Sequence, residues 1–356
     1  MKYPIFAPAL LVLLFSLSCR SAPADIDESR YIPEEELEQV PKEEPDEEPE
    51  PFIDLPPVNE SLPVSSFGEV WAYVMVGRES ALVRGLPLSD VVYFGAEVDY
   101  YGKLVDVPDR RKLQAFAGRV HLVVACNNYS LTHFVLVPDS AERKALIADL
   151  LAATKDYDGL QIDFENIPLR DGGNFLSFLG ELRAGLGNKM FSAALRARTR
   201  KIADDVHDYE KIKNVVDRIL VMAYDEHWST SEPGPVASLT WCRRVAQHAL
   251  DLIGREKLIM GIPFYGRAWG DTNHSRALVY SGVEDVVNEN RVTQIWRENG
   301  IPTFDYTAPV RVKVYYEDDY SLAARMEMYK SIGVGSVGFW RLGQETAAVW
   351  NVVKLE

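Results

Sequence analysis

Residues Asp158-Gly-Leu-Gln-Ile-Asp163-Phe-Glu165 form the most informative stretch of this chain. From Leu160 to Glu165 apolar and polar side chains alternate, and a period of two predicts a β-strand. Gln161, Asp163 and Glu165 therefore share one face. An exposed edge strand would show the same alternation, but the apolar flanks favour a strand that is covered on its other face. Barrel enzymes place their proton-transfer groups at the C-terminal ends of such strands.

The residues from Phe67 to Glu356 show no further break in composition, and their number suits one large barrel or a doubly wound domain. Helix-like segments separate most of the strand-like ones, and this repetition predicts a parallel sheet. Strands are expected at 70–76, 91–98, 120–126, 159–165, 191–195, 218–224, 257–262 and 335–340. Helices are expected at 141–154, 174–186, 208–215, 239–252 and 320–331.

Eight such strands predict an α/β fold, a (β/α)8 TIM barrel. The doubly wound alternative needs a glycine-rich phosphate-binding turn after the first strand, and Val76-Gly77-Arg78 is not one. The segment from about residue 271 to 314 interrupts the rhythm, with a helix expected over 283–299 and a strand over 310–316. We expect a small α+β insertion between strands seven and eight, walling a substrate cleft.

Residues 1–18 are interpreted as a signal peptide, because their apolar run is shorter than the ~20 residues that a membrane-spanning helix needs. Ser18 before Cys19 resembles the lipobox of a bacterial lipoprotein, so Cys19 is expected to become a lipidated N-terminus. The alternative is cleavage near Ala24, after the pattern Ala22-Pro-Ala24. The first route anchors an exported protein to a membrane of the cell envelope. The second releases it to the periplasm or the medium.

An acidic tether is expected from Cys19 to residue 66. Residues 25–56 hold 14 acidic residues against two basic ones, a net charge of −12 in a chain of −15. Many like charges, repeated Pro and few aromatics predict a disordered spacer. Residues 57–356 keep a net charge near −5, which argues against nucleic acid as a partner, since that binding needs clustered Lys and Arg. A monomer is expected.

Two cysteines remain after the lipobox, Cys126 and Cys242. An exported protein could pair them, but their spacing does not demand it, and buried free thiols are favoured. Neither cysteine has metal-ligand neighbours, and the six His show no ligand spacing. With no phosphate-binding loop either, no metal and no cofactor is expected.

Other predicted strands also end in polar and aromatic side chains. They are Tyr224 and Asp225 after 218–224, Tyr265 and Arg267 after 257–262, and Trp340 at the end of 335–340. A tryptophan at a strand end is more often part of the core when it stands alone. Aromatic faces combined with acids, however, suit a sugar, whose C–H faces stack while its hydroxyls form hydrogen bonds.

At this point a family resemblance emerges. Asp158-Gly159 followed by Asp163-x-Glu165 resembles the D-G-x-D-x-D-x-E signature of glycoside hydrolase family 18, the chitinase family. Residues 222–225 (Met-x-Tyr-Asp) resemble its sixth-strand motif, and 263–267 (Pro-x-Tyr-Gly-Arg) its seventh. Trp340 falls where the family has the aromatic floor of its −1 subsite. The resemblance spans 67–356, and residues 224–237 most resemble the spore-cortex branch, whose members cut peptidoglycan rather than chitin.

The resemblance implies retaining, substrate-assisted hydrolysis of β-1,4 bonds next to N-acetylglucosamine. Glu165 would be the general acid and then the base, and Asp163 would orient the 2-acetamido group that attacks C1. Tyr224 would hold the acetamido oxygen and Asp225 the distorted sugar. An ionised Asp163 beside Glu165 would keep Glu165 protonated by like-charge repulsion. Gln161, Met222, Tyr265, Arg267 and Trp340 would complete the substrate site.

Gln161 departs from the family pattern, which has Asp at this position. An amide can hydrogen-bond Asp163 but cannot take its proton, so Asp163 is expected to stay ionised and to face Glu165. We expect activity with an altered pH profile.

Two other functions fit the sequence less well. One is a non-catalytic glycan-binding lipoprotein with the same fold. The other is an envelope scaffold whose function depends on the acidic tether rather than on the barrel. Inactive relatives typically lose the acidic Glu, and this chain keeps Glu165. The sequence therefore favours an enzyme that acts on an N-acetylated glycan.

Overall fold

A computed structural model describes residues 61–271, 275–307 and 310–356. The expected signal peptide, Cys19 and most of the acidic tether lie outside these residues. Within them, no helix combines the length and apolar character needed to cross a bilayer.

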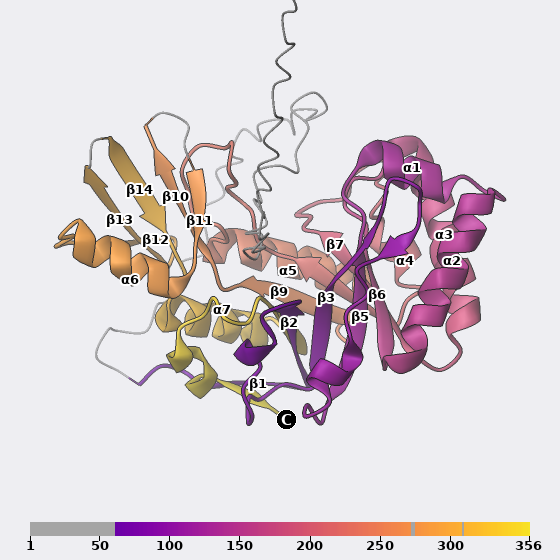
Figure 1. The fold of residues 1–356 in the computed structure, drawn as a ribbon. Helices are drawn as coiled ribbons and strands as arrows, with labels where there is room; N and C mark the ends of the chain where they lie inside the picture. Colours follow the sequence, from indigo (N-terminus) through magenta and orange to yellow (C-terminus); the bar gives the residue numbers. More distant parts are fainter. Residues whose placement is uncertain (1–60, 272–274, 308–309) are drawn as a thin grey trace, which may run out of the picture. The chain divides into compact units, whose positions relative to one another are not determined.

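The described part of the chain contains a closed barrel of eight parallel strands (Figure 1). Each barrel strand pairs with the next one along the chain, and the last strand pairs with the first, which closes the ring. All eight expected strands are present, so the predicted TIM barrel is confirmed. In chain order the strands are β2 (Glu69–Met75), β3 (Asp90–Val98), β5 (Arg119–Ala125), β6 (Gly159–Asp163), β7 (Met190–Arg196), β8 (Arg218–Met222), β9 (Leu258–Pro263) and β15 (Ser336–Trp340).

Most helices lie close to their predicted positions. Most of them also begin after a residue whose side chain caps the first turn. Ser140, Ser238 and Asp318 each accept a hydrogen bond from the backbone N–H three residues on. A first helix capped by Asn128 was not expected, and the segment 208–215 holds only one helical turn. The helices outside the insertion are α1 (Tyr129–Leu136), α2 (Ala141–Ala153), α3 (Gly172–Leu186), α4 (Tyr209–Ile212), α5 (Leu239–Ile253) and α7 (Asp319–Ser331).

The predicted insertion between the seventh and eighth barrel strands is a five-stranded antiparallel sheet with one helix against it. The sheet begins at Gly266, so Arg267 belongs to it. The helix expected over 283–299 ends at Glu289, and a short strand follows, so that part of the prediction was wrong. The elements are β10 (Gly266–Gly270), β11 (Ser275–Leu278), α6 (Tyr280–Glu289), β12 (Trp296–Glu298), β13 (Ile301–Thr307) and β14 (Arg311–Tyr315).

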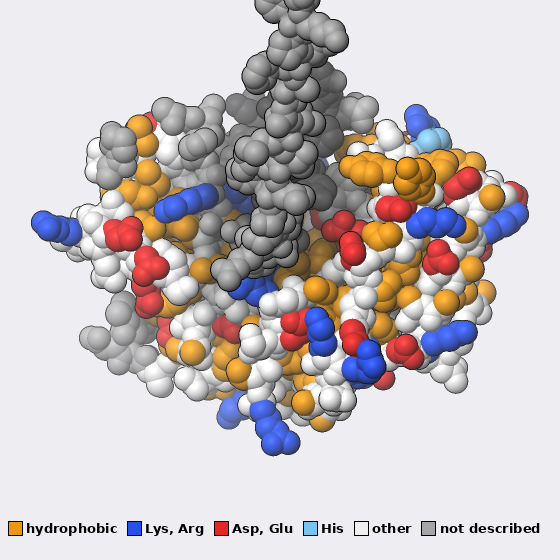
Figure 2. Space-filling view, viewed as in Figure 1, with side chains coloured by type: hydrophobic (Ala, Val, Ile, Leu, Met, Phe, Trp, Pro, Cys, Tyr) orange, Lys and Arg blue, Asp and Glu red, His pale blue; other side chains and the backbone are white. Residues whose placement is uncertain are grey.

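Three short strands complete the described part. β4 (Leu104–Val105) pairs antiparallel with β3. β1 (Ser65–Phe67) pairs parallel with β16 (Val353–Leu355), which joins the first and last elements. Cys126 and Cys242 are buried free thiols, as favoured from the sequence. On the face seen in Figure 2, acidic and basic side chains are interspersed.

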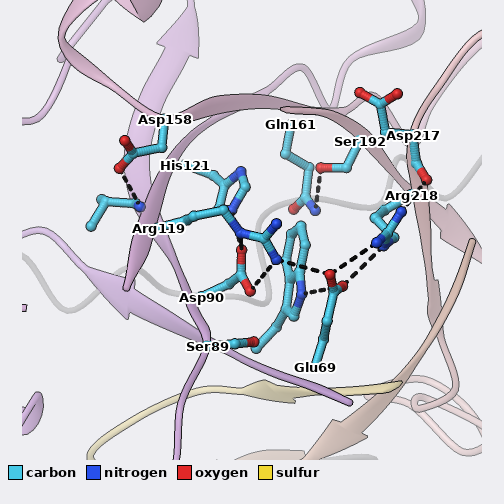
Figure 3. A network of polar contacts seen from close by, with 12 residues as sticks. Glu69, Ser89, Asp90, Arg119, His121, Asp158, Gln161, Ser192, Asp217 and Arg218 are labelled. Carbon is cyan, nitrogen blue, oxygen red and sulfur yellow. Dashed lines mark hydrogen bonds and ion pairs between the residues drawn. The ribbon is translucent and has the colours of Figure 1, made fainter. Parts of the chain in front are cut away.

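Ion pairs link the N-terminal ends of the barrel strands (Figure 3). Glu69, which begins β2, accepts hydrogen bonds from Arg119 at 2.8 Å and from Arg218 at 2.9 Å. Arg119 also binds Asp90 at 2.6 Å, and His121 lies 2.7 Å from the same Asp90 oxygen. Burial alone would raise the pKa of Glu69, but the hydrogen bonds from Arg218 and Arg119 outweigh it and lower that pKa. The network therefore holds β2, β3, β5 and β8 at the end opposite the polar strand ends.

We predict that Glu69→Gln lowers the free energy of unfolding by about 2–3 kcal/mol, because it leaves two guanidinium groups without their shared carboxylate. Urea unfolding followed by circular dichroism measures this. The matched control is Arg111→Gln, whose pair with Asp109 is exposed to solvent and should change the free energy of unfolding little. Equal destabilisation by the two variants would contradict a structural role for the network.

Candidate functional site

Asp163 and Glu165 lie where β6 ends. Asp163 is the last residue of the strand and is buried, and its Oδ1 atom has no hydrogen-bond partner among the described residues. Glu165 follows two residues later, and its side chain is 33% exposed. The Asp163 carboxyl is thus buried beneath the mouth of the barrel, and the Glu165 carboxyl is partly exposed at it.

Residues after β8 and β9 face this pair from across the mouth. The Tyr265 hydroxyl donates a hydrogen bond of 2.5 Å to Asp225 Oδ1, and the rings of Tyr224 and Tyr265 meet edge to face. Asp225 adopts a left-handed backbone conformation, with φ of 58°. Such a conformation is uncommon for a residue other than glycine and is found at functional sites. Arg267 is buried in β10, and its charge acts on Asp225.

Trp340 ends β15 and lies over the barrel interior. Its ring packs edge to face against Tyr73, with centroids 5.0 Å apart, and against Phe94, at 5.3 Å. Met222 belongs to the same interior cluster. Trp340 therefore forms an aromatic floor beneath the mouth, while Met222 contributes to the packing that supports it.

Gln161 lies deeper in the barrel and is fully buried. Its amide oxygen accepts a hydrogen bond from the Tyr73 hydroxyl. Its amide nitrogen donates one of 3.1 Å to Ser192 Oγ (Figure 3). Within the part of the chain that the structure describes, the amide binds these two hydroxyls rather than Asp163. The hydrogen bond to Asp163 that the sequence allows for Gln161 is thus absent there.

The surroundings of Asp163 and Glu165 favour their protonated forms. Burial raises the pKa of Asp163 well above its usual value, and the charge of Glu165 adds to this while Arg196 opposes it. Burial also raises the pKa of Glu165; Arg196 opposes the rise and Asp225 adds to it. The pair therefore keeps a proton to higher pH than two isolated carboxyls would. These directions do not support an Asp163 that stays ionised.

Asp225 is exposed, yet enough protein surrounds its carboxyl for desolvation to raise its pKa. The hydrogen bond from Tyr265 and the charge of Arg267 oppose this rise. A carboxylate placed between a phenol and a cation can accept hydrogen bonds from a sugar hydroxyl without moving.

The structure brings the residues predicted from the strand ends to one mouth, and it adds four that were not predicted. Tyr73 and Ser192 were hidden because they lie within apolar strands, where alternation alone gives them no special weight. Arg196 was detectable: it is a cation at the end of the fifth barrel strand, and the strand-end argument applied there would have found it. Asn166 follows Glu165 and hydrogen-bonds Arg196 at 2.6 Å.

Comparison with known proteins agrees with this geometry. The sequence profile described as "Glycosyl hydrolases family 18" matches residues 87–345. The chain belongs to this family. It is similar to two Bacillus subtilis (strain 168) proteins, the uncharacterized glycosylase YvbX and the putative sporulation-specific glycosylase YdhD. The first is 28% identical over 57% of this chain and 62% of the relative, and the second is 29% identical over 65% and 58%. The matches thus span about three fifths of these relatives.

The chain is also similar to the cortical fragment-lytic enzyme of Bacillus anthracis, with 23% identity over 75% of this chain and 67% of that enzyme. Among solved structures, the Bacillus cereus spore cortex-lytic enzyme SleL covers 81% of this chain and 74% of its own, with a TM-score of 0.72 and 21% identity. A chitinase from Chromobacterium violaceum covers 80% and 97%, with a TM-score of 0.71 and 22% identity. At these identities the two structures support the fold alone.

We predict that Gln161→Asp moves the alkaline limb of the kcat/KM–pH profile to higher pH. A third carboxyl beside Asp163 and Glu165 disfavours their ionised forms, so the proton donor keeps its proton longer. The profiles of wild type, Gln161→Asp and the amide-preserving control Gln161→Asn are measured on one soluble glycan substrate. If Gln161→Asp and wild type gave identical profiles, position 161 would have no influence on the pair.

Proposed function

We propose that the protein is a retaining glycosidase that hydrolyses β-1,4 bonds next to N-acetylglucosamine, with peptidoglycan as its substrate. The observation that carries this proposal is the pair of Asp163 and Glu165 at the mouth of the barrel, with raised pKa values and with Trp340 as an aromatic floor. Membership in the family supports the reaction class. Similarity to cortex-lytic relatives favours peptidoglycan over chitin.

In this proposal Glu165 protonates the glycosidic oxygen. Its raised pKa suits that role, since a general acid must hold its proton near the working pH. The 2-acetamido oxygen of the substrate attacks C1, the bond to the leaving sugar breaks, and an oxazolinium ion forms. Glu165 then removes a proton from water, whose oxygen attacks C1 while the bond from C1 to the acetamido oxygen breaks. The acetamido group is restored, and the product has retained configuration.

Asp163 orients the acetamido group from beneath. Its buried Oδ1, which lacks a partner among the described residues, accepts a hydrogen bond from the acetamido N–H and so holds the acetamido oxygen toward C1. Tyr224 and Asp225 hold the sugar from the β8 side, and Trp340 stacks beneath it. Tyr265 and Arg267 keep the Asp225 carboxylate in place.

We predict that Glu165→Gln lowers kcat about 100- to 10,000-fold, which is the usual effect of removing a general acid–base group. The measurement is muropeptide release from purified peptidoglycan. Glu327→Gln, the same substitution at an exposed acid on α7, is the control and should keep wild-type activity.

Equal release by wild type and Glu165→Gln, with both variants folded by circular dichroism, would refute the catalytic role of Glu165. Release by neither would favour the non-catalytic glycan-binding alternative. A thiazoline mimic of the oxazolinium ion should inhibit the wild type competitively, and insensitivity to it would point to an enzymic nucleophile instead.

We further propose that the protein is exported and held at the cell envelope by a lipid on Cys19, with residues 20–64, which precede β1, as a spacer. The signal-like residues before Cys19 and the acidic composition after it support this. Metabolic labelling with an alkyne palmitate analogue should tag the wild type and not Cys19→Ser. Absence of label on the mature wild-type protein would favour cleavage near Ala24.

A further inference from the structure

The chain is basic where β7 ends, although it is acidic as a whole: Arg196, Arg198, Arg200 and Lys201 occur within six residues. Asp205 holds Arg198 through two hydrogen bonds, and Glu210 binds Lys201. Arg196 is placed differently. Its guanidinium donates to the Asn166 amide, and the carboxylate it approaches is that of Glu165, at 3.8 Å.

Arg196 is held in this position from two sides. The Asn166 side chain accepts its hydrogen bond and donates one of 2.8 Å to the Asn127 carbonyl, while Tyr209 donates one of 2.6 Å to the Arg196 carbonyl. Asn166 is buried, whereas the Arg196 side chain remains 41% exposed. The guanidinium is thus fixed beside the proposed proton donor and still open to a ligand.

The positive charge of Arg196 disfavours the protonated form of Glu165, which the proposed reaction needs. Burial raises the pKa of Glu165, but the positive charge of Arg196 opposes that rise. When Glu165 carries its proton, the guanidinium faces a neutral carboxyl instead of a charged partner. An anionic group of the substrate would give Arg196 a charged partner. It would also offset the effect of the Arg196 charge on the pKa of Glu165.

We propose that Arg196 binds a carboxylate on the sugar joined through the oxygen that Glu165 protonates, so that the site selects acidic glycans over neutral ones. The inference rests on the proposed glycosidase function and specifies its substrate class. A guanidinium matches a carboxylate with two parallel hydrogen bonds, which a neutral N-acetylglucosamine polymer cannot supply. In peptidoglycan the carboxylate belongs either to the lactyl group of muramic acid or to a peptide stem.

Binding of the carboxylate also prepares the acid for reaction. Among the other ionisable groups that interact with Glu165, the two aspartates disfavour a second negative charge when they are ionised, and the two tyrosines stay neutral because burial raises their pKa values. These groups are Asp163 on β6, Asp225 and Tyr224 after β8, and Tyr73 on β2. With Arg196 paired to the substrate, these surroundings keep Glu165 protonated to higher pH, so the acidic substrate promotes its own cleavage.

The test compares full-length wild type, Arg196→Gln, Arg196→Lys and Lys201→Gln. Four soluble substrates are used: peptide-free peptidoglycan oligosaccharides, the same oligosaccharides with methyl-esterified lactyl groups, peptide-bearing oligosaccharides, and N-acetylglucosamine oligomers. Steady-state kcat and KM are measured across pH. Thermal melting checks that each variant is folded.

Wild type should prefer carboxylate-bearing substrates by about 10- to 100-fold in kcat/KM, the range of one charge-assisted interaction. Arg196→Gln should lose this preference mainly through KM and, on neutral oligomers, move the alkaline limb to higher pH. Arg196→Lys should keep part of the preference, because it keeps the charge. Lys201→Gln removes a charge from the same segment and should keep all of it.

A preference for peptide-free over esterified oligosaccharides would assign the carboxylate to the lactyl group, and a preference confined to peptide-bearing ones would assign it to the stem. If wild type cleaved acidic and neutral substrates equally well, the role of Arg196 would be overturned and the glycosidase would stand. A preference that Arg196→Gln and Lys201→Gln retained alike would also overturn it. A wild type that cleaved none of the substrates would overturn both proposals.

Discussion

The register of β6 within the closed ring is the constraint on which the site depends. Gln161 pairs with Ser192 of β7, and Asp163 pairs with Ala125 of β5. Because side chains alternate along a strand, this register turns Gln161 into the barrel and brings Asp163 up beneath the mouth. A shift by one residue would exchange these side chains for Leu160 and Ile162, which pack in the core. Closure of the barrel fixes this register and therefore determines which side chains reach the mouth.

Much of this arrangement was accessible from the sequence, for a definite physical reason. Parallel strands that are buried on both faces are apolar runs bounded by breaks, so all eight could be located, and their polar ends marked the mouth. The family signature carried the assignment of roles at Glu165 and Asp163, which alternation alone does not provide. The helix of the insertion was overextended because Trp296 and its neighbours continue an apolar pattern that the chain uses for an edge strand.

The hydrogen-bond partners of Gln161 could not be predicted from the local sequence pattern. Tyr73 and Ser192 reach Gln161 from strands 88 and 31 residues away in sequence, so only the closed barrel reveals the contact. The protonation of Asp163 is likewise a property of burial, which exceeds any influence of the amide two residues earlier. Where the sequence suggested a charged aspartate, the packed structure favours a neutral one.

The pairing of the first and last elements has a consequence for synthesis of the protein. β2 is hydrogen-bonded to β15, and β1 to β16, so the beginning of the barrel has no partner on one side until β15 and β16 have been synthesised. Until then β2 and β9 present open edges, which are templates for wrong strand pairing. Barrel closure is therefore a late, long-range event, and a chain that stops before β15 leaves the substrate mouth without its floor.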